Sequence, residues 1–149
     1  MNDEASNMQI NEIPSWFSVV AWIAFVWNLM GVAAFVAQMM MTPEMLAALP
    51  EVERKMYENI PMWVTIAFAC AVFGGATGSL LLALKKAISF SVLIISLMGV
   101  IVQMYHSFFV IDLMTVYGPG KAIMPAMVII IATLLVWLAN DAKNKGWIS

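Results

Sequence analysis

Charged side chains are scarce in this sequence of 149 residues. They make up 11% of the chain, against roughly 25% in ordinary soluble domains, while hydrophobic residues make up 63%. The longest segments without any charge cover residues 13–43, 59–84, 87–111 and 122–140. A helix needs about 20 mostly apolar residues to cross a hydrocarbon core about 30 Å thick, so each segment has room for one crossing. Water is therefore not the expected solvent for most of the chain.

Cysteine and clustered basic residues are also missing. Cys70 is the only cysteine and lies within an uncharged segment, which excludes an intrachain disulfide and a zinc site built from cysteines. Residues 1–14 include acidic residues but no Lys or Arg, so they lack the basic region of a secretory signal, and the first span is expected to remain in the mature protein. The net charge of −2 and the lack of a basic cluster predict no nucleic-acid partner.

Catalytic and metal-binding signatures do not occur. The sequence has no Ser/His/Asp arrangement, no phosphate-binding loop and no HExxH helix. His106 is the only histidine, and ligation of haem or a metal would need further suitable ligands. Met39, Met40 and Met41 are consecutive, so on a helix their side chains point in different directions. We therefore expect neither an enzyme nor a bound cofactor or metal.

The pattern that is present is that of four apolar spans. Unpaired peptide groups are costly in lipid, and the segments are too long and too uniformly apolar for barrel strands, so each span is expected to be a helix. The predicted spans cover residues 15–41, 62–84, 87–111 and 122–140. The predicted fold is an all-α integral membrane four-helix bundle over residues 15–141, with an acidic N-terminal tail at 1–14 and a short C-terminal tail at 142–149.

The connections between the spans differ in length. Only Lys85 and Lys86 separate the second span from the third, which predicts a tight antiparallel hairpin. Between the first and second spans, Thr42 is placed as a helix N-cap and Pro43 as the first helical residue. Pro50 interrupts this segment. We therefore predict two short amphipathic helices there, with their charged residues facing water.

The basic residues give an orientation. Four crossings place both termini and the hairpin on one side of the bilayer. That side carries Lys85, Lys86, Lys143 and Lys145, and the other carries Arg54, Lys55 and Lys121. By the positive-inside rule, the termini are expected in the cytoplasm.

Small residues form one face of the second span. Ala67, Ala71, Gly74 and Gly78 fall within about 60° of arc on a helical wheel. Small side chains let two helix backbones approach closely, a contact that in lipid takes the place of the hydrophobic drive. We interpret these residues as a helix-packing face whose partner belongs either to this chain or to a second copy. The alternative is a glycine hinge or a narrow pore wall.

Polar side chains share one face of the third span, and a similar face occurs on the first span. The third-span face consists of Ser89, Ser96, Gly99, Gln103, His106 and Ser107. Because an unpaired amide in hydrocarbon costs on the order of a few kcal/mol, the two faces are expected to meet. The predicted polar seam comprises Asn28, Gln38, Gln103 and His106, with Asp112 and Tyr117 at its mouth. It is either a hydrogen-bond network that fixes helix packing or a path for a substrate or proton.

An ordered set of short motifs gives a family resemblance over residues 14–148. The motifs include Trp27-Asn28-Leu29-Met30-Gly31, Phe73-Gly74-Gly75, Gln103-Met104-Tyr105, Tyr117-Gly118-Pro119-Gly120 and Lys145-Gly146-Trp147. With them the chain resembles small four-helix bacterial membrane proteins of unassigned function, some of which are automatically labelled sugar transporters. The resemblance implies a multi-pass protein of the bacterial inner membrane and favours transport.

Two hypotheses of function follow. In the first, the protein moves, or helps to move, a small polar solute such as a sugar, with Asn28, Gln38, Gln103 and His106 binding it. Because four short helices leave little interior room, this hypothesis includes a homo-oligomer with a pathway between copies. In the second, the chain is a non-transporting accessory or structural subunit that docks a larger membrane partner. In both hypotheses the lipid bilayer surrounds the bundle.

Overall fold

The computed structural model describes residues 12–149, and every regular element in that range is a helix. The long helices are α1 (Ser15–Met39), α4 (Met62–Ala83), α5 (Ser89–Tyr105) and α7 (Ile123–Asn144). The short ones are α2 (Pro43–Ala47), α3 (Glu51–Glu58), the π-helix η1 (His106–Val110), α6 (Leu113–Tyr117) and the 3-10 helix η2 (Pro119–Ala122). The predicted all-α fold with helical connectors is confirmed. The acidic tail predicted at 1–14 lies, up to residue 11, outside the described residues.

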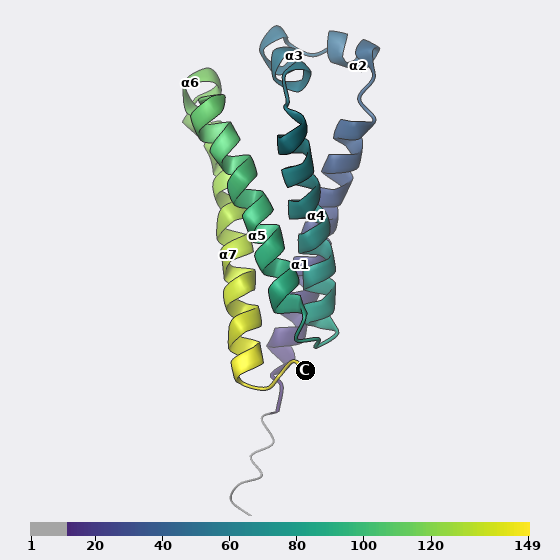
Figure 1. The fold of residues 1–149 in the computed structure, drawn as a ribbon, viewed down its shortest axis with the longest axis vertical. Helices are drawn as coiled ribbons and strands as arrows, with labels where there is room; N and C mark the ends of the chain where they lie inside the picture. The colour runs from purple at the N-terminus through teal and green to yellow at the C-terminus, as the bar shows by residue number, and fades with distance from the viewer. Residues whose placement is uncertain (1–11) are drawn as a thin grey trace, which may run out of the picture.

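The four long helices run side by side along the long axis of the molecule (Figure 1). Each is long and apolar enough to cross a membrane, the third when η1 is counted with α5. Large apolar side chains such as Ile23, Met62 and Ile130 point outward, whereas alanine, glycine and serine fill much of the interior. This is a small multi-span membrane protein whose apolar outer surface contacts lipid.

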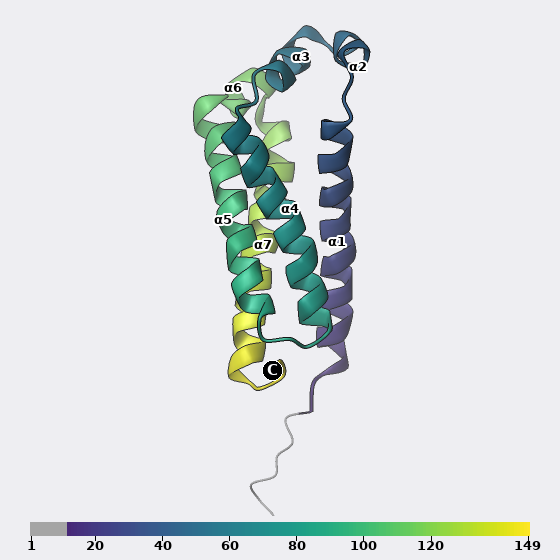
Figure 2. The ribbon, with the colours of Figure 1, turned by 45° about the vertical axis from the view of Figure 1, so that its right-hand side comes forward.

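Helix α4 holds the centre of the arrangement. It packs closely against α1 on one side and α5 on the other, and α7 packs against α5 (Figure 2). In contrast, α1 and α7 are not among the closely packed pairs of helices in the described chain. The two outer helices of the series therefore leave a seam between them.

The contact between α4 and α5 is close because glycines stand where the helices meet. A Cβ atom on Gly99 would lie 2.7 Å from the carbonyl oxygen of Ala67 and 2.8 Å from the amide nitrogen of Ala71. The Ser96 hydroxyl donates a hydrogen bond of 2.6 Å to the carbonyl oxygen of Ala71. Gly74 lies against Ser96 in the same way.

The small-residue face predicted for the second span, Ala67, Ala71, Gly74 and Gly78, thus lies against α5. Gly78 approaches Leu93 of that helix so closely that an added Cβ would be 2.7 Å from its side chain. The partner of this face is a helix of the same chain.

Replacement of Gly99 by valine is expected to destabilise the protein by about 1–3 kcal/mol, because the new side chain would overlap backbone atoms of α4 that cannot rotate away. The matched control is Gly120→Val, since nothing lies within 4 Å of a Cβ on Gly120. Reversible unfolding by SDS in mixed micelles measures both free energies. Equal free energies of unfolding for the two variants would show that α4 and α5 can move apart to admit the valine without loss of stability.

The end of the bundle that holds the hairpin and the C-terminus is closed by an apolar cluster, here called the end cluster: Phe17, Leu82, Leu138, Trp147 and Ile148. The C-terminal segment 145–149 turns back after α7 (Figure 1). Its last residue then pairs with the hairpin, because the amide of Ser149 donates to the Lys85 carbonyl and the amide of Ala87 donates to the Ser149 carbonyl, each at 3.0 Å. The segment predicted as a tail is therefore part of the packed structure.

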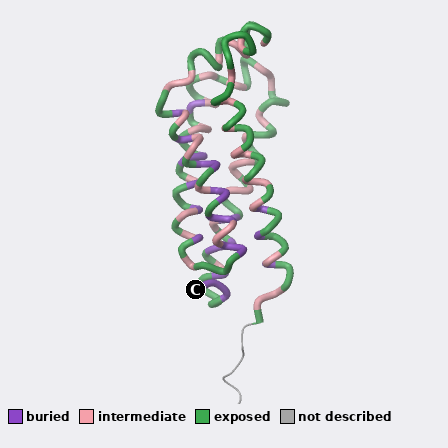
Figure 3. Tube along the Cα trace, turned by 90° about the vertical axis from the view of Figure 1, so that its right-hand side faces the viewer, coloured by how far each residue is buried: buried purple, intermediate pink, exposed green. Residues whose placement is uncertain are grey.

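The opposite end carries the short helices, and most of their residues are exposed or half-buried (Figure 3). Helix α2 begins as predicted, with the Thr42 hydroxyl accepting a hydrogen bond of 3.3 Å from the amide of Met45. Pro50 separates α2 from α3, as predicted. Asp112, the second residue after η1, adopts a left-handed conformation, φ 52°, and the third span ends before it.

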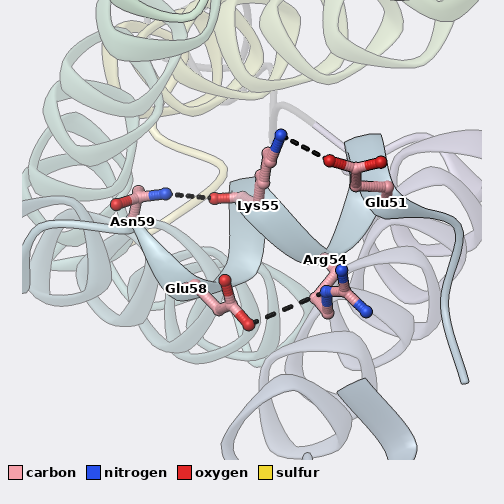
Figure 4. A network of polar contacts seen from close by, with 5 residues as sticks. All are labelled: Glu51, Arg54, Lys55, Glu58 and Asn59. Carbon is pink, nitrogen blue, oxygen red and sulfur yellow. Dashed lines mark hydrogen bonds and ion pairs between the residues drawn. The ribbon is translucent and has the colours of Figure 1, made fainter. Parts of the chain in front are cut away.

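Exposed side chains stabilise α3 along its own length. Lys55 pairs with Glu51 at 2.6 Å and Arg54 with Glu58 at 3.9 Å, and the Asn59 amide donates to the Lys55 carbonyl (Figure 4). Exposed pairs four residues apart contribute about 0.3–0.5 kcal/mol each, so they support the helix itself. Contact with the bundle is made by the other face of α3.

Candidate functional site

A cavity of about 430 Å³ lies beneath α3, at the end of the bundle away from the termini, and we call it the polar cavity. Its polar side chains come from α1, α3, α5, η1, α6 and η2: Gln38, Glu53, Tyr57, Gln103, His106, Ser107, Tyr117 and Lys121. Its apolar side chains include Met56, Val64 and Phe68. Such a size is in the range of small-molecule sites.

His106 is the most deeply placed polar side chain of this cavity, with 5% of its surface exposed. Its ring stands edge-on to the indole of Trp63, with centroids 5.3 Å apart. It begins η1, where the amide of Ile111 donates to the His106 carbonyl at 3.0 Å, a bond that spans five residues. A π-turn inserts an extra residue into the helix, and such turns are frequent at functional sites.

The side chains of Gln38, Gln103 and His106 form no hydrogen bond with any other side chain or backbone group among residues 12–149. By contrast, the hydroxyl of Ser107 donates to the Gln103 carbonyl at 3.1 Å. Two amides and an imidazole thus bring unused donors and acceptors to one cavity. They can bind a hydroxylated molecule without contributing a fixed charge.

The outer wall of the polar cavity is formed by phenols and by one charge of each sign. The hydroxyl of Tyr117 donates to the sulfur of Met56, which ties α6 to α3. Burial raises the pKa of the Tyr117 phenol, and the nearby Glu53 carboxylate and Tyr57 raise it further. The phenol is therefore protonated at neutral pH. Glu53 and Lys121 balance each other, so the formal charge of the wall is zero.

A second cavity, of about 420 Å³, lies deeper between the long helices, and we call it the apolar cavity. All four long helices line it, through side chains such as Trp27, Val72, Val100, Val128 and Leu135. Asn28 lines it too, but its amide is already engaged: Nδ2 donates to the Ala24 carbonyl at 2.8 Å. The rest of that amide fills the space beside Gly75, where a Cβ would lie 2.9 Å from Asn28 Cγ.

The predicted seam is thus divided between two cavities. Gln38, Gln103 and His106 line the polar cavity, whereas Asn28 lines the apolar one, and Gln103 lines both. Of the two residues expected at the mouth, Tyr117 lines the polar cavity, and Asp112 is exposed and does not.

Three polar residues of the site were missed by sequence reasoning: Glu53, Tyr57 and Lys121. Glu53 and Tyr57 belong to α3, whose charged residues were expected to face water, and Lys121 belongs to the turn before α7. The amphipathic pattern of α3 is the one signal in the sequence that could have indicated that one face of this helix lies toward the bundle.

Within residues 12–149 no group of three or more His, Cys, Asp or Glu side chains lies close enough to hold a metal ion. Comparison of the chain with family models, curated proteins and solved structures gave no match. A proposal for the function therefore rests on the geometry of the two cavities.

Proposed function

We propose that the protein binds a small polar solute such as a sugar in the polar cavity and moves it, or helps to move it, across the membrane. The observation that carries this proposal is the convergence of Gln38, Gln103 and His106, three side chains with unused hydrogen-bonding groups, on one cavity of about 430 Å³. These groups are accessible from the cavity, so the hydroxyls of a solute or water can bond to them. The role proposed is binding and transport, without catalysis.

The proposal places the termini and the hairpin in the cytoplasm, since four basic residues lie at that end and three at the other. The resemblance to bacterial proteins makes the bacterial inner membrane the proposed location. The polar cavity then faces the outer side. The end cluster, with Phe17 and Leu82 completely buried, supports a conformation closed toward the cytoplasm.

A pathway between copies of the chain was expected because four helices were thought to leave little interior room. Both cavities are lined by residues of one chain, so the solute site needs no second copy. Self-association remains a separate proposal about the state of the protein in the membrane.

The test is uptake of radiolabelled monosaccharides and polyols into liposomes that contain the purified protein. Wild type should exceed protein-free liposomes for at least one solute, and Gln103→Leu should lower that uptake about fivefold, since one lost hydrogen bond is worth roughly 1 kcal/mol. Thr133→Val is the control, because the Thr133 hydroxyl is exposed on α7 and bonds to Ile129 of its own helix. Uptake at the protein-free level for every solute would reject transport.

A further inference from the structure

The polar and apolar cavities adjoin, and we propose that together they bind one amphiphile, with an uncharged polyhydroxyl headgroup in the polar cavity and an alkyl chain in the apolar cavity. This inference rests on the proposed function, because it names the class of molecule that presents the polar group to Gln38, Gln103 and His106. It differs from that function in requiring an apolar chain on the ligand.

The two cavities meet at Phe68 of α4 and Gln103 of α5, the two side chains that line both. On α1, α4 and α5 the two sets of lining residues follow one another along the axis. On α5 and η1 the apolar cavity takes Leu93 to Met104, and the polar cavity takes Gln103 to Ile111. A molecule that occupies both therefore lies along the bundle, with its polar end beneath α3.

The apolar cavity is suited to hydrocarbon rather than to water. Its only amide and hydroxyl side chains are those of Asn28, Ser96 and Gln103. Asn28 and Ser96 already donate to backbone carbonyls, at 2.8 Å and 2.6 Å. The Gln103 side chain, at the junction with the polar cavity, makes no hydrogen bond within residues 12–149. Apolar cavities of this kind stay dry and accept apolar molecules.

The length of the apolar cavity fits an alkyl chain that reaches into the middle of the bilayer. The lining extends over eleven helical steps, from Leu93 to Met104 on α5 and from Met124 to Leu135 on α7. At 1.5 Å per residue this is about 16 Å, or roughly half of a 30 Å hydrocarbon core.

An alkyl chain can reach this cavity from the lipid. The cavity is lined by Met30 and Ala34 of α1 and by Val128 and Ala132 of α7, the two helices that do not pack closely against each other. The alkyl chain would therefore enter between α1 and α7 at the depth of the hydrocarbon core, without passing through water.

The headgroup chemistry follows from the walls of the polar cavity. Amides, an imidazole and the phenol hydroxyls offer donors and acceptors to hydroxyl groups. Glu53 and Lys121 contribute opposite charges, so neither an anionic nor a cationic headgroup is favoured overall. An uncharged polyhydroxyl group is the class that uses these side chains best.

The test compares octyl glucoside with glucose, using the full-length protein in phosphatidylcholine nanodiscs and radiolabelled ligands below the critical micelle concentration. Octyl glucoside should bind saturably, with a dissociation constant at least tenfold below that of glucose. Because octyl glucoside also concentrates at the bilayer, the decisive measure is the dissociation constant of glucose divided by that of octyl glucoside. This ratio is compared between wild type and two variants. Ala132→Phe, which fills the apolar cavity, should reduce the ratio at least tenfold, and Ala126→Phe, on an exposed and non-lining position of α7, should leave it unchanged.

A second measurement uses the wild-type chain and needs no variant to fold. An octyl glucoside with a diazirine at the end of its alkyl chain should label cavity residues such as Trp27, Met104 and Val128 after irradiation. Labelling confined to outward residues such as Ile23 and Ile130 would overturn the inference.

The outcomes separate this inference from the proposed function. If both ligands bind equally and both are lost in His106→Leu, the polar solute site stands and the amphiphile is rejected. If neither binds saturably, or if His106→Leu changes neither, the polar cavity is not the binding site and both ideas fail.

Discussion

Replacement of Trp147 by alanine is expected to destabilise the protein by about 3–5 kcal/mol, the cost of removing a large buried aromatic side chain. Trp147 is 8% exposed in the end cluster, and its ring packs edge-on against Phe17 with centroids 5.5 Å apart. The Lys145 ammonium lies 4.7 Å from the same ring and adds a cation–π contact. The substitution would therefore open a cavity where α1, α7 and the C-terminal segment meet.

The matched control is Trp137→Ala. Trp137 is on α7 but 62% of its surface is exposed, so its loss should cost less than about 1 kcal/mol. SDS unfolding in mixed micelles gives the two free energies, and proteolysis at the C-terminus reports whether the segment 145–149 has come loose. Similar values for the two variants would mean that the end cluster contributes little to stability.

The four spans could be predicted from sequence because lipid imposes a simple rule on them. A charge within a span is costly, so the uncharged segments mark the helices, and the first three helices begin and end within two residues of the predicted bounds. Helix α7 continues four residues beyond the predicted end at 140, to Asn144. Asp141 and Lys145 bond to each other at 2.7 Å there and Ala142 is buried, so the helix extends past the uncharged segment.

The packing of the C-terminus could not be predicted, because it depends on contacts between segments far apart in the chain. The charged residues Lys143 and Lys145 indicate an exposed segment, and both are exposed. Trp147 is buried in a cluster that includes Phe17 of α1, and no local period of the sequence shows that contact.

Part of the site followed from the cost of polar groups in lipid. That cost indicated Gln38, Gln103 and His106, which line one cavity, but it could not tell them from Asn28. An amide four residues after an acceptor carbonyl can bond within its own helix, and Asn28 does so with Ala24. The period of a helix does not show whether an amide bonds within its own helix or stays available in a cavity.

Replacement of His106 by leucine is expected to weaken solute binding about 10- to 100-fold, because an apolar side chain would leave a solute hydroxyl without a partner in a buried site, at a cost of roughly 1–3 kcal/mol. His106→Gln should recover most of the binding, since an amide restores a donor and an acceptor. Leucine can still pack against Trp63, so the free energy of unfolding should change by less than about 1 kcal/mol.

Equilibrium dialysis with the solute found by the uptake assay measures the binding, and SDS unfolding measures the stability of the same preparations. Thr77→Val serves as control, because Thr77 is exposed on α4 and lines neither cavity. If His106→Leu binds like wild type but unfolds more easily, the imidazole serves helix packing alone. If binding falls while stability is unchanged, and His106→Gln restores binding, the solute recognises the unpaired imidazole. The π-turn that begins at His106 would then serve to place this imidazole in the cavity.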